Sequence, residues 1–144
     1  MKKYLKLALL IAWCYVIFNF SAQPSIDGVS ATSKVIVILS KVLYTLMPNA
    51  TIDLMDYSLI IAKIGHLGEF FILGLLTYLC FMDFTLSYYL YSYLFTLFYG
   101  FTDEFHQLFV EGRNSSLIDV GIDFFGASLA IFLIHNLRKC LKKS

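Results

Sequence analysis

The stretch that decides the fold is KIGHLGEFFILGLLTYLCFM, at residues 63–82. Between Ile64 and Met82 its only formally charged side chain is Glu69, and most of the other residues are apolar or small. An α-helix rises about 1.5 Å per residue, so about 20 such residues cross the hydrocarbon core of a bilayer. Residues 62–82 are therefore predicted to form a transmembrane helix.

Three further stretches on either side of it have the same character. Residues 7–26 and 84–102 hold no charged side chain, and residues 120–137 hold Asp123 alone. The sequence therefore predicts an all-α integral membrane protein, with four transmembrane helices in a single domain over the whole chain. The expected spans are about 4–21, 62–82, 84–103 and 118–137.

The composition agrees with a membrane protein. Of the 144 residues, 59% are hydrophobic and 15% are charged, whereas soluble domains average about 45–50% and about 25%. The mean hydropathy is +0.75. So few charges cannot cover the surface of a soluble protein of this size, which excludes a soluble enzyme domain and a nucleic-acid binder. Cys14, Cys80 and Cys140 lie far apart without metal-binding spacing and are expected to be small apolar residues.

Two stretches leave alternatives open. Residues 33–47 are apolar but too short to span comfortably, and their polar side chains, which include Lys34 and Lys41, fall on one helical side. We expect a short amphipathic helix in the outer interface, with a re-entrant or merely packed helix as the alternative. The first apolar stretch could also be a cleaved signal peptide, because MKKYLK at residues 1–6 resembles a basic n-region.

Basic residues at the two ends of the chain predict its orientation. Seven of the eleven Lys and Arg residues flank the first and last spans. They are Lys2, Lys3, Lys6, Arg138, Lys139, Lys142 and Lys143. An even number of spans places both termini on one side, and the positive-inside rule makes that side cytoplasmic. The chain is thus expected to be a multi-pass protein of the plasma membrane whose environment is the lipid bilayer.

Polar residues gather at one predicted depth. Counting about 20 residues from the cytoplasmic ends of the last three helices reaches Lys63, Asp103 and Ile118. Ionisable groups near the outer edge of a membrane are costly unless they are paired or hydrated, so they are candidates for function. The candidate ligand-binding residues are Lys63, His66, Glu69, Asp103, Glu104, Gln107, Arg113, Asp119 and Asp123.

The spacing of the candidate residues places those of each helix on one face of that helix. Residues three or four positions apart lie on the same side of a helix. The pairs are His66 with Glu69, Asp103 with Gln107, and Asp119 with Asp123. Gly126 and Ala130 continue the last stripe and would let a neighbouring helix approach closely. If the three faces turn inward, they form one polar pocket that opens outward.

These motifs resemble the VanZ-like family of bacterial membrane proteins. The resemblance rests on KIGHLGEFFILGLL at residues 63–76 and YGFTDEFHQLFVEGRNSSLIDVGIDFFG at residues 99–126. All nine candidate residues fit the family pattern position by position, as do Gly112 and Gly126. The resemblance implies a Gram-positive cell envelope protein connected with low-level resistance to teicoplanin-type glycopeptide antibiotics.

One hypothesis for the pocket is recognition. Arg113 and Lys63 would hold a phosphate or carboxylate, since an arginine can make two parallel hydrogen bonds to such a group. Asp119, Glu104 and Gln107 would bond to sugars or amides. The partner would be a cell-wall precursor, an envelope polymer or a lipoglycopeptide.

Two other hypotheses remain open. The first is an enzyme that modifies a lipid-linked cell-wall substrate, with His66 as general base oriented by a carboxylate such as Glu69 or Asp103, and Glu104 as a further catalytic candidate. In a variant of it, a divalent cation is held by carboxylates. The metal-ligand candidates are Asp103, Glu104, Asp119 and Asp123. The second is purely structural, with the charges pairing to lock the helices together.

Overall fold

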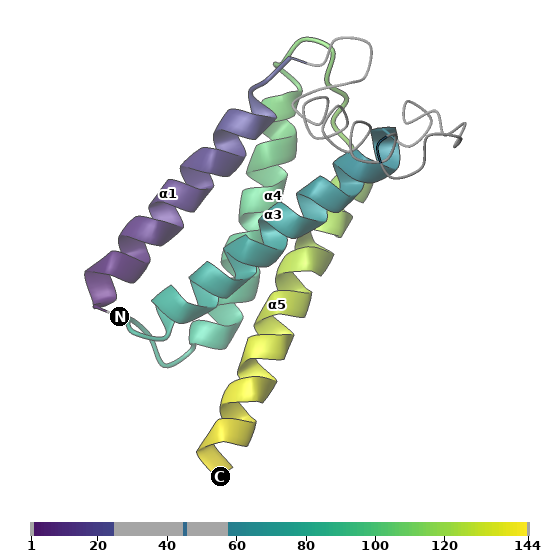
Figure 1. Cartoon of the computed structure of the whole chain (residues 1–144). Helices are drawn as coiled ribbons and strands as arrows, with labels where there is room; N and C mark the ends of the chain where they lie inside the picture. The colour runs from purple at the N-terminus through teal and green to yellow at the C-terminus, as the bar shows by residue number, and fades with distance from the viewer. Residues whose placement is uncertain (1, 25–44, 46–57, 144) are drawn as a thin grey trace.

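The computed structural model describes residues 2–24, 45 and 58–143. Over these ranges the chain forms α-helices and no strand (Figure 1). The helices are α1 (Lys3–Ser21), α3 (Ser58–Phe81), α4 (Tyr88–Gln107) and α5 (Leu117–Lys143). The amphipathic helix expected at 33–47 lies outside the described residues, apart from Thr45.

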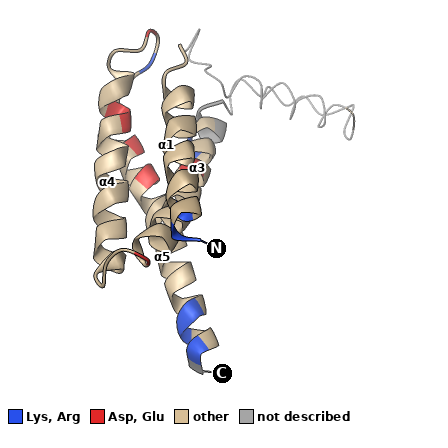
Figure 2. Cartoon of the chain, turned by 90° about the vertical axis from the view of Figure 1, so that its left-hand side faces the viewer, with Lys and Arg blue, Asp and Glu red and all other residues tan. Residues whose placement is uncertain are grey.

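The four helices form an up-and-down bundle. Figure 1 shows the two termini at the same end of the bundle, as an even number of antiparallel passes requires. Among the four described helices, α3 and α4 each contact the three others, whereas α1 contacts α3 and α4 but not α5. Lys and Arg gather at the end that holds both termini, and Asp and Glu lie mostly toward the opposite end (Figure 2).

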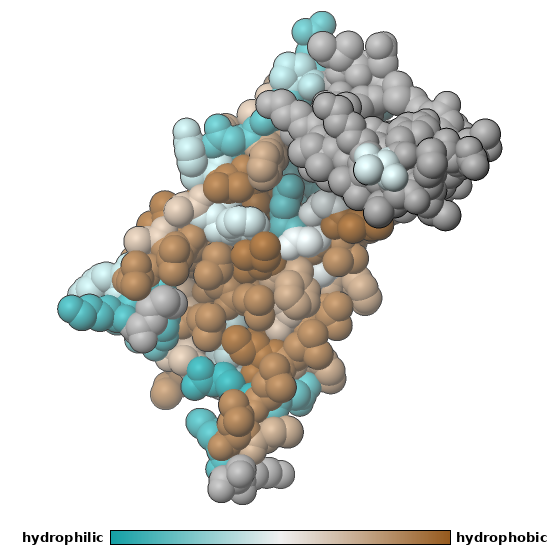
Figure 3. Space-filling view, viewed as in Figure 1, coloured by the Kyte–Doolittle hydropathy of each residue, from teal (hydrophilic) through white to brown (hydrophobic). Residues whose placement is uncertain are grey.

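Three of these helices have the length and hydropathy of membrane spans. They are Lys3–Ser21, Ala62–Phe81 within α3 and Leu117–Lys142 within α5. The surface between the two polar ends of the molecule is dominated by hydrophobic side chains (Figure 3). Large apolar residues are exposed there, among them Phe98 at 68% and Phe132 at 56%. Exposing so broad an apolar surface to water is energetically unfavourable, so this surface fits a lipid environment.

α4 buries small and polar side chains inside the bundle and exposes large aromatic ones on its outer surface. It is 20 residues long and lies alongside the others, although it falls outside the set of clearly apolar spans. Small and polar residues occupy its buried stripe, whereas Phe98, Phe101 and Phe105 are exposed. The buried stripe consists of Ser92, Thr96, Gly100, Asp103, Glu104 and Gln107. The hydropathy of α4 is low because its inner face is polar.

Two glycines bring α3 and α5 into backbone contact. A Cβ added at Gly74 would lie 2.5 Å from the carbonyl oxygen of Ala127, and one at Gly126 would overlap the carbonyl oxygen of Leu67. Ala127 and Ala130 are fully buried beside them. The close approach expected from the small residues of the last helix is therefore present, and Gly126 makes it possible.

α1 is attached to the bundle through two hydrogen bonds to backbone carbonyls. The Trp13 indole donates to the carbonyl of Glu69 at 2.9 Å, and the Tyr99 hydroxyl donates to the carbonyl of Cys14 at 2.6 Å. At the end with the termini, Lys6 and Asp83 form an ion pair of 2.6 Å. These contacts join α1 to α3, to α4 and to the turn between them.

The helix boundaries differ from those expected at four places, one of which is the end of α4, at Gln107 and not near residue 103. α4 begins at Tyr88 rather than near residue 84, because residues 82–87 form the turn from α3, in which the amides of Asp83 and Phe84 bond to carbonyls of the last turn of α3. α3 starts earlier, at Ser58, and α5 continues to Lys143. Lysine and arginine are good helix formers, so the basic tail of α5 extends the helix past its apolar segment.

Candidate functional site

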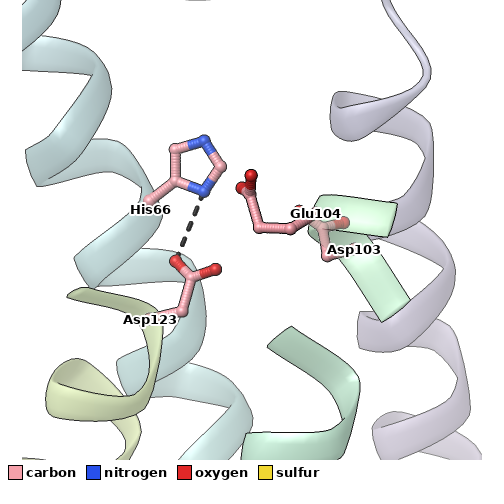
Figure 4. Close-up of side chains that lie close together, drawn as sticks. All are labelled: His66, Asp103, Glu104 and Asp123. Carbon is pink, nitrogen blue, oxygen red and sulfur yellow. Dashed lines mark ion pairs between the residues drawn. The ribbon is translucent and has the colours of Figure 1, made fainter. Parts of the chain in front are cut away.

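Four ionisable side chains from three helices meet inside the bundle. They are His66 of α3, Asp103 and Glu104 of α4, and Asp123 of α5 (Figure 4). One nitrogen or oxygen atom of each lies within 4.8 Å of the others. We call this group the acidic cluster.

The acidic cluster is almost completely shielded. Asp123 is 0% exposed, Glu104 3% and Asp103 5%, and the His66 side chain is 19% exposed. Burying a charged group is costly unless other groups compensate for its lost hydration. Three carboxylates face one imidazole, so the group has an excess of acidic side chains.

One ionic contact links His66 to Asp123, and hydrogen bonds hold Asp103 and Glu104 in place. The Nδ1 atom of His66 lies 3.3 Å from a carboxylate oxygen of Asp123. Gln107 donates from its amide to Asp103 at 2.9 Å. The backbone N–H of Ser116 donates to Glu104 at 2.8 Å. The carboxylate that contacts His66 is thus Asp123, where Glu69 or Asp103 had been expected to orient it.

Several polar atoms of the acidic cluster are buried without a hydrogen bond. These are Oε1 of Glu104, both carboxylate oxygens of Asp123 and Nδ1 of His66; the Nδ1 atom and one Asp123 oxygen have only their ionic contact with each other. Figure 4 shows the Glu104 carboxylate extending from α4 toward His66 and Asp123. Nearly all buried polar atoms in proteins have partners, so such a group of unsatisfied oxygens requires an explanation.

The structure separates Asp119 from the acidic cluster. Its carboxylate forms an ion pair of 2.5 Å with Lys63, and both side chains are partly exposed. Lys63 precedes His66 by three residues and Asp119 precedes Asp123 by four, so this pair lies one turn closer to the loop end. Asp119 was a metal-ligand candidate together with Asp103, Glu104 and Asp123. Its place in the four-residue group is taken by His66.

Glu69 and Arg113 lie at the margin of the acidic cluster. Glu69 interacts electrostatically with His66, Asp103, Asp123 and Arg113. Arg113 follows Gly112, whose φ of 74° allows the sharp turn between α4 and α5.

Ser116 was missed by sequence reasoning. Its backbone amide binds Glu104, and its hydroxyl accepts a hydrogen bond from the N–H of Ile118 at the start of α5. A serine directly before an apolar helix is a helix-capping signal. The bond to Glu104 has no sequence signal, because every residue except proline has a backbone N–H.

A comparison with family models decides the relationship of this chain. The model of the VanZ/LLP1 family matches residues 6–138. The chain belongs to the VanZ/LLP1 family. All nine candidate residues lie within the matched region. Comparisons with curated proteins and with solved structures each found no match.

This VanZ/LLP1 chain also has an apolar groove beside the acidic cluster. The groove has a volume of about 370 Å³ and is lined by residues of α4 and α5 near the loop that joins them. Its walls include Phe101, Phe105, Leu108 and Leu117, and Glu104 lines it too. Glu104 therefore belongs both to the groove and to the buried acidic cluster. The open cavity is mostly apolar, whereas the polar side chains lie deeper.

Proposed function

We propose that this VanZ/LLP1 protein binds an amphiphilic envelope molecule, with an apolar chain in the groove and a polar head group at the acidic cluster. The observation that carries the proposal is the position of Glu104, which lines the apolar groove and is also a member of the acidic cluster. A ligand that fits both regions has a hydrocarbon part and a polar part. Membrane lipids, lipid-linked cell-wall precursors and lipoglycopeptides have this construction.

The charge of the site favours a particular kind of head group. Carboxylates repel a bare phosphate and accept hydrogen bonds from hydroxyls and amides. Asp103, Glu104 and Asp123 therefore suit a sugar or peptide head group. Arg113, whose Nε is buried without a hydrogen bond within the described residues, is the group best suited to a phosphate or carboxylate of the same ligand.

The proposal includes a topology. All four helices span the plasma membrane, both termini are cytoplasmic, and the acidic cluster lies toward the outer side. The basic residues at the end with the termini support this orientation (Figure 2). Teicoplanin-type antibiotics carry an apolar chain, and binding or sequestering such a molecule would link this site to low-level resistance.

The first experiment compares teicoplanin with vancomycin in a susceptible Gram-positive host that expresses the chain. We expect the inhibitory concentration of teicoplanin to rise and that of vancomycin to stay constant. Glu104→Gln, which neutralises the shared residue, and Leu117→Trp, which fills the groove, should each remove the protection. Leu133→Trp is the matched control, since Leu133 is exposed on α5 and does not line the groove.

Membrane abundance is measured for every variant. A drop in abundance for Glu104→Gln would indicate a structural charge cluster instead of a binding site. Equal protection by Leu117→Trp and by the unmodified chain would contradict the role of the groove.

A second candidate function is an enzyme acting on a lipid-linked cell-wall substrate. The contact between His66 and Asp123 favours it, because a carboxylate on Nδ1 orients an imidazole as general acid or base at Nε2. Incubating the purified chain with lipid extracted from Gram-positive membranes tests this function. Product that forms with the unmodified chain and not with His66→Gln would establish it, and no product in either would refute it.

A further inference from the structure

We infer that the acidic cluster is a binding site for one divalent cation, held by His66, Asp103, Glu104 and Asp123. This inference goes beyond the proposed function, because a cation can bind whether or not an amphiphile occupies the groove. Three independent features of the site carry it: the separation of the donor atoms, the unsatisfied buried oxygens, and the excess of acidic groups.

The donor atoms are nearly at coordination distance from one centre. Ligand oxygens and nitrogens lie about 2.0–2.2 Å from a small divalent ion, so two ligands are at most about 4.4 Å apart and those at right angles about 3.0 Å apart. The donor atoms of the acidic cluster span 4.8 Å, and His66 and Asp123 are 3.3 Å apart. Side-chain shifts of less than about 1 Å would complete a coordination shell.

The unsatisfied oxygens point to a ligand independently of that spacing. Asp123 is fully buried and Glu104 is 97% buried, yet three of their four carboxylate oxygens lack a hydrogen bond within the described residues. Glu104 is directed toward His66 and Asp123 across the interior (Figure 4). An unpaired carboxylate in a low-dielectric interior is strongly destabilised, and a bound cation removes that penalty.

No side-chain cation of the described part of the chain fills this role. Lys63 is already paired with Asp119 at 2.5 Å. Arg113 interacts electrostatically with Asp103 and Glu69, but it forms no ion pair with any carboxylate of the described residues. His66 alone cannot balance three carboxylates.

The donor set selects the class of cation. One imidazole nitrogen with three carboxylate oxygens suits manganese, iron or zinc in the divalent state, and Mn²⁺ is the one of these three for which carboxylate oxygens are a preferred ligand type. The set contains no cysteine, so a soft ion such as Cu(I) is disfavoured.

Groups around the acidic cluster would orient its ligands in the way that metal sites require. Gln107 holds Asp103, and the Ser116 amide holds one oxygen of Glu104 while leaving the other unbonded. Such outer-shell hydrogen bonds fix the direction of a ligand, and removing one commonly weakens metal affinity by about 10- to 100-fold.

The test uses the full chain in nanodiscs, stripped with a chelator and then titrated with Mn²⁺. We expect about one Mn²⁺ per chain after desalting, measured by elemental analysis, together with a rise in Tm. Asp123→Asn and Glu104→Gln should lose this ion. Asp119→Asn is the matched control, because it removes a carboxylate from the same helix one turn away and should retain the ion.

A second measurement keeps the inference falsifiable if a variant folds poorly. Without metal, Asp123→Asn relieves an uncompensated carboxylate, so its Tm should equal or exceed that of the stripped unmodified chain. A lower Tm would mean that Asp123 is a structural partner of His66. Gln107→Leu should weaken Mn²⁺ binding by about 10- to 100-fold.

The outcomes separate this inference from the proposed function. Bound Mn²⁺ without selective teicoplanin protection would support the cation site and reject the amphiphile. Protection without stoichiometric Mn²⁺, Zn²⁺ or Fe²⁺ would overturn the cation site. Equal loss of metal in Asp119→Asn and Asp123→Asn would also overturn it, because binding would then follow net charge.

Discussion

Replacing Gly126 by alanine should destabilise the protein and disturb the acidic cluster. The new Cβ would overlap the carbonyl oxygen of Leu67 on α3. Both atoms belong to helix backbones, so no flexible side chain can move aside. Overpacking of this kind costs about 1–3 kcal/mol, whereas alanine in place of glycine gains about 1 kcal/mol of helix propensity. We expect Gly126→Ala to lose a net of about 0–2 kcal/mol.

Gly121→Ala provides the matched control on the same helix. A Cβ at Gly121 has nothing within 4 Å, so only the propensity gain remains. The two variants should therefore differ by the overpacking cost of about 1–3 kcal/mol in the free energy of unfolding. The assay is unfolding in mixed micelles with increasing SDS, followed by circular dichroism.

Gly126→Ala should also change the geometry of the acidic cluster. Leu67 follows His66 directly, and Gly126 lies three residues after Asp123, so separating α3 from α5 lengthens the 3.3 Å contact between His66 and Asp123. Weaker Mn²⁺ binding should accompany the stability loss. If Gly126→Ala and Gly121→Ala unfold at the same SDS concentration, the close backbone contact does not exist in the membrane and the reasoning fails.

Two further predictions concern α1 and the topology. Trp13→Phe removes the hydrogen bond to the carbonyl of Glu69 and should lower the free energy of unfolding by about 0.5–1.5 kcal/mol in the same SDS titration. An unchanged free energy of unfolding would show that this hydrogen bond does not hold α1 to the bundle. Cys140 is exposed at the end with the termini, so a membrane-impermeant thiol reagent should label it only after the cells are opened. Glu111→Cys, in the loop between α4 and α5, should be labelled in intact cells, and the reverse pattern would invert the topology.

The depth and the face of the polar residues could be read from the sequence. Ionisable groups about 20 residues from the predicted cytoplasmic end of each of the last three spans were expected to lie at one level, and spacings of three or four placed them on one side of each helix. His66, Asp103 and Asp123 do meet inside the bundle. Family membership, inferred from the same motifs, is confirmed over residues 6–138.

The pairing of those residues could not be read from the sequence. Asp119 and Asp123 share one face of α5, yet Asp119 contacts Lys63 while Asp123 contacts His66. The axial offset between neighbouring helices decides which side chains meet. For α3 and α5, that offset depends on the backbone contacts at Gly74 and Gly126. The sequence also does not locate the start of α4, because residues 84–87 carry no charge and continue into the uncharged stretch that ends at residue 102.

The two glycine contacts between α3 and α5 determine which parts of the bundle can move. Backbone atoms that are already in contact leave α3 and α5 little freedom to slide or rotate against each other. His66 and Asp123 should therefore keep the same position relative to each other. Asp103 and Glu104 are carried by α4, whose Gly100 makes no such close contact, since an added Cβ there would have its nearest neighbour at 3.6 Å. We therefore expect exchange at the site to proceed by tilting of α4 about the turn at 82–87.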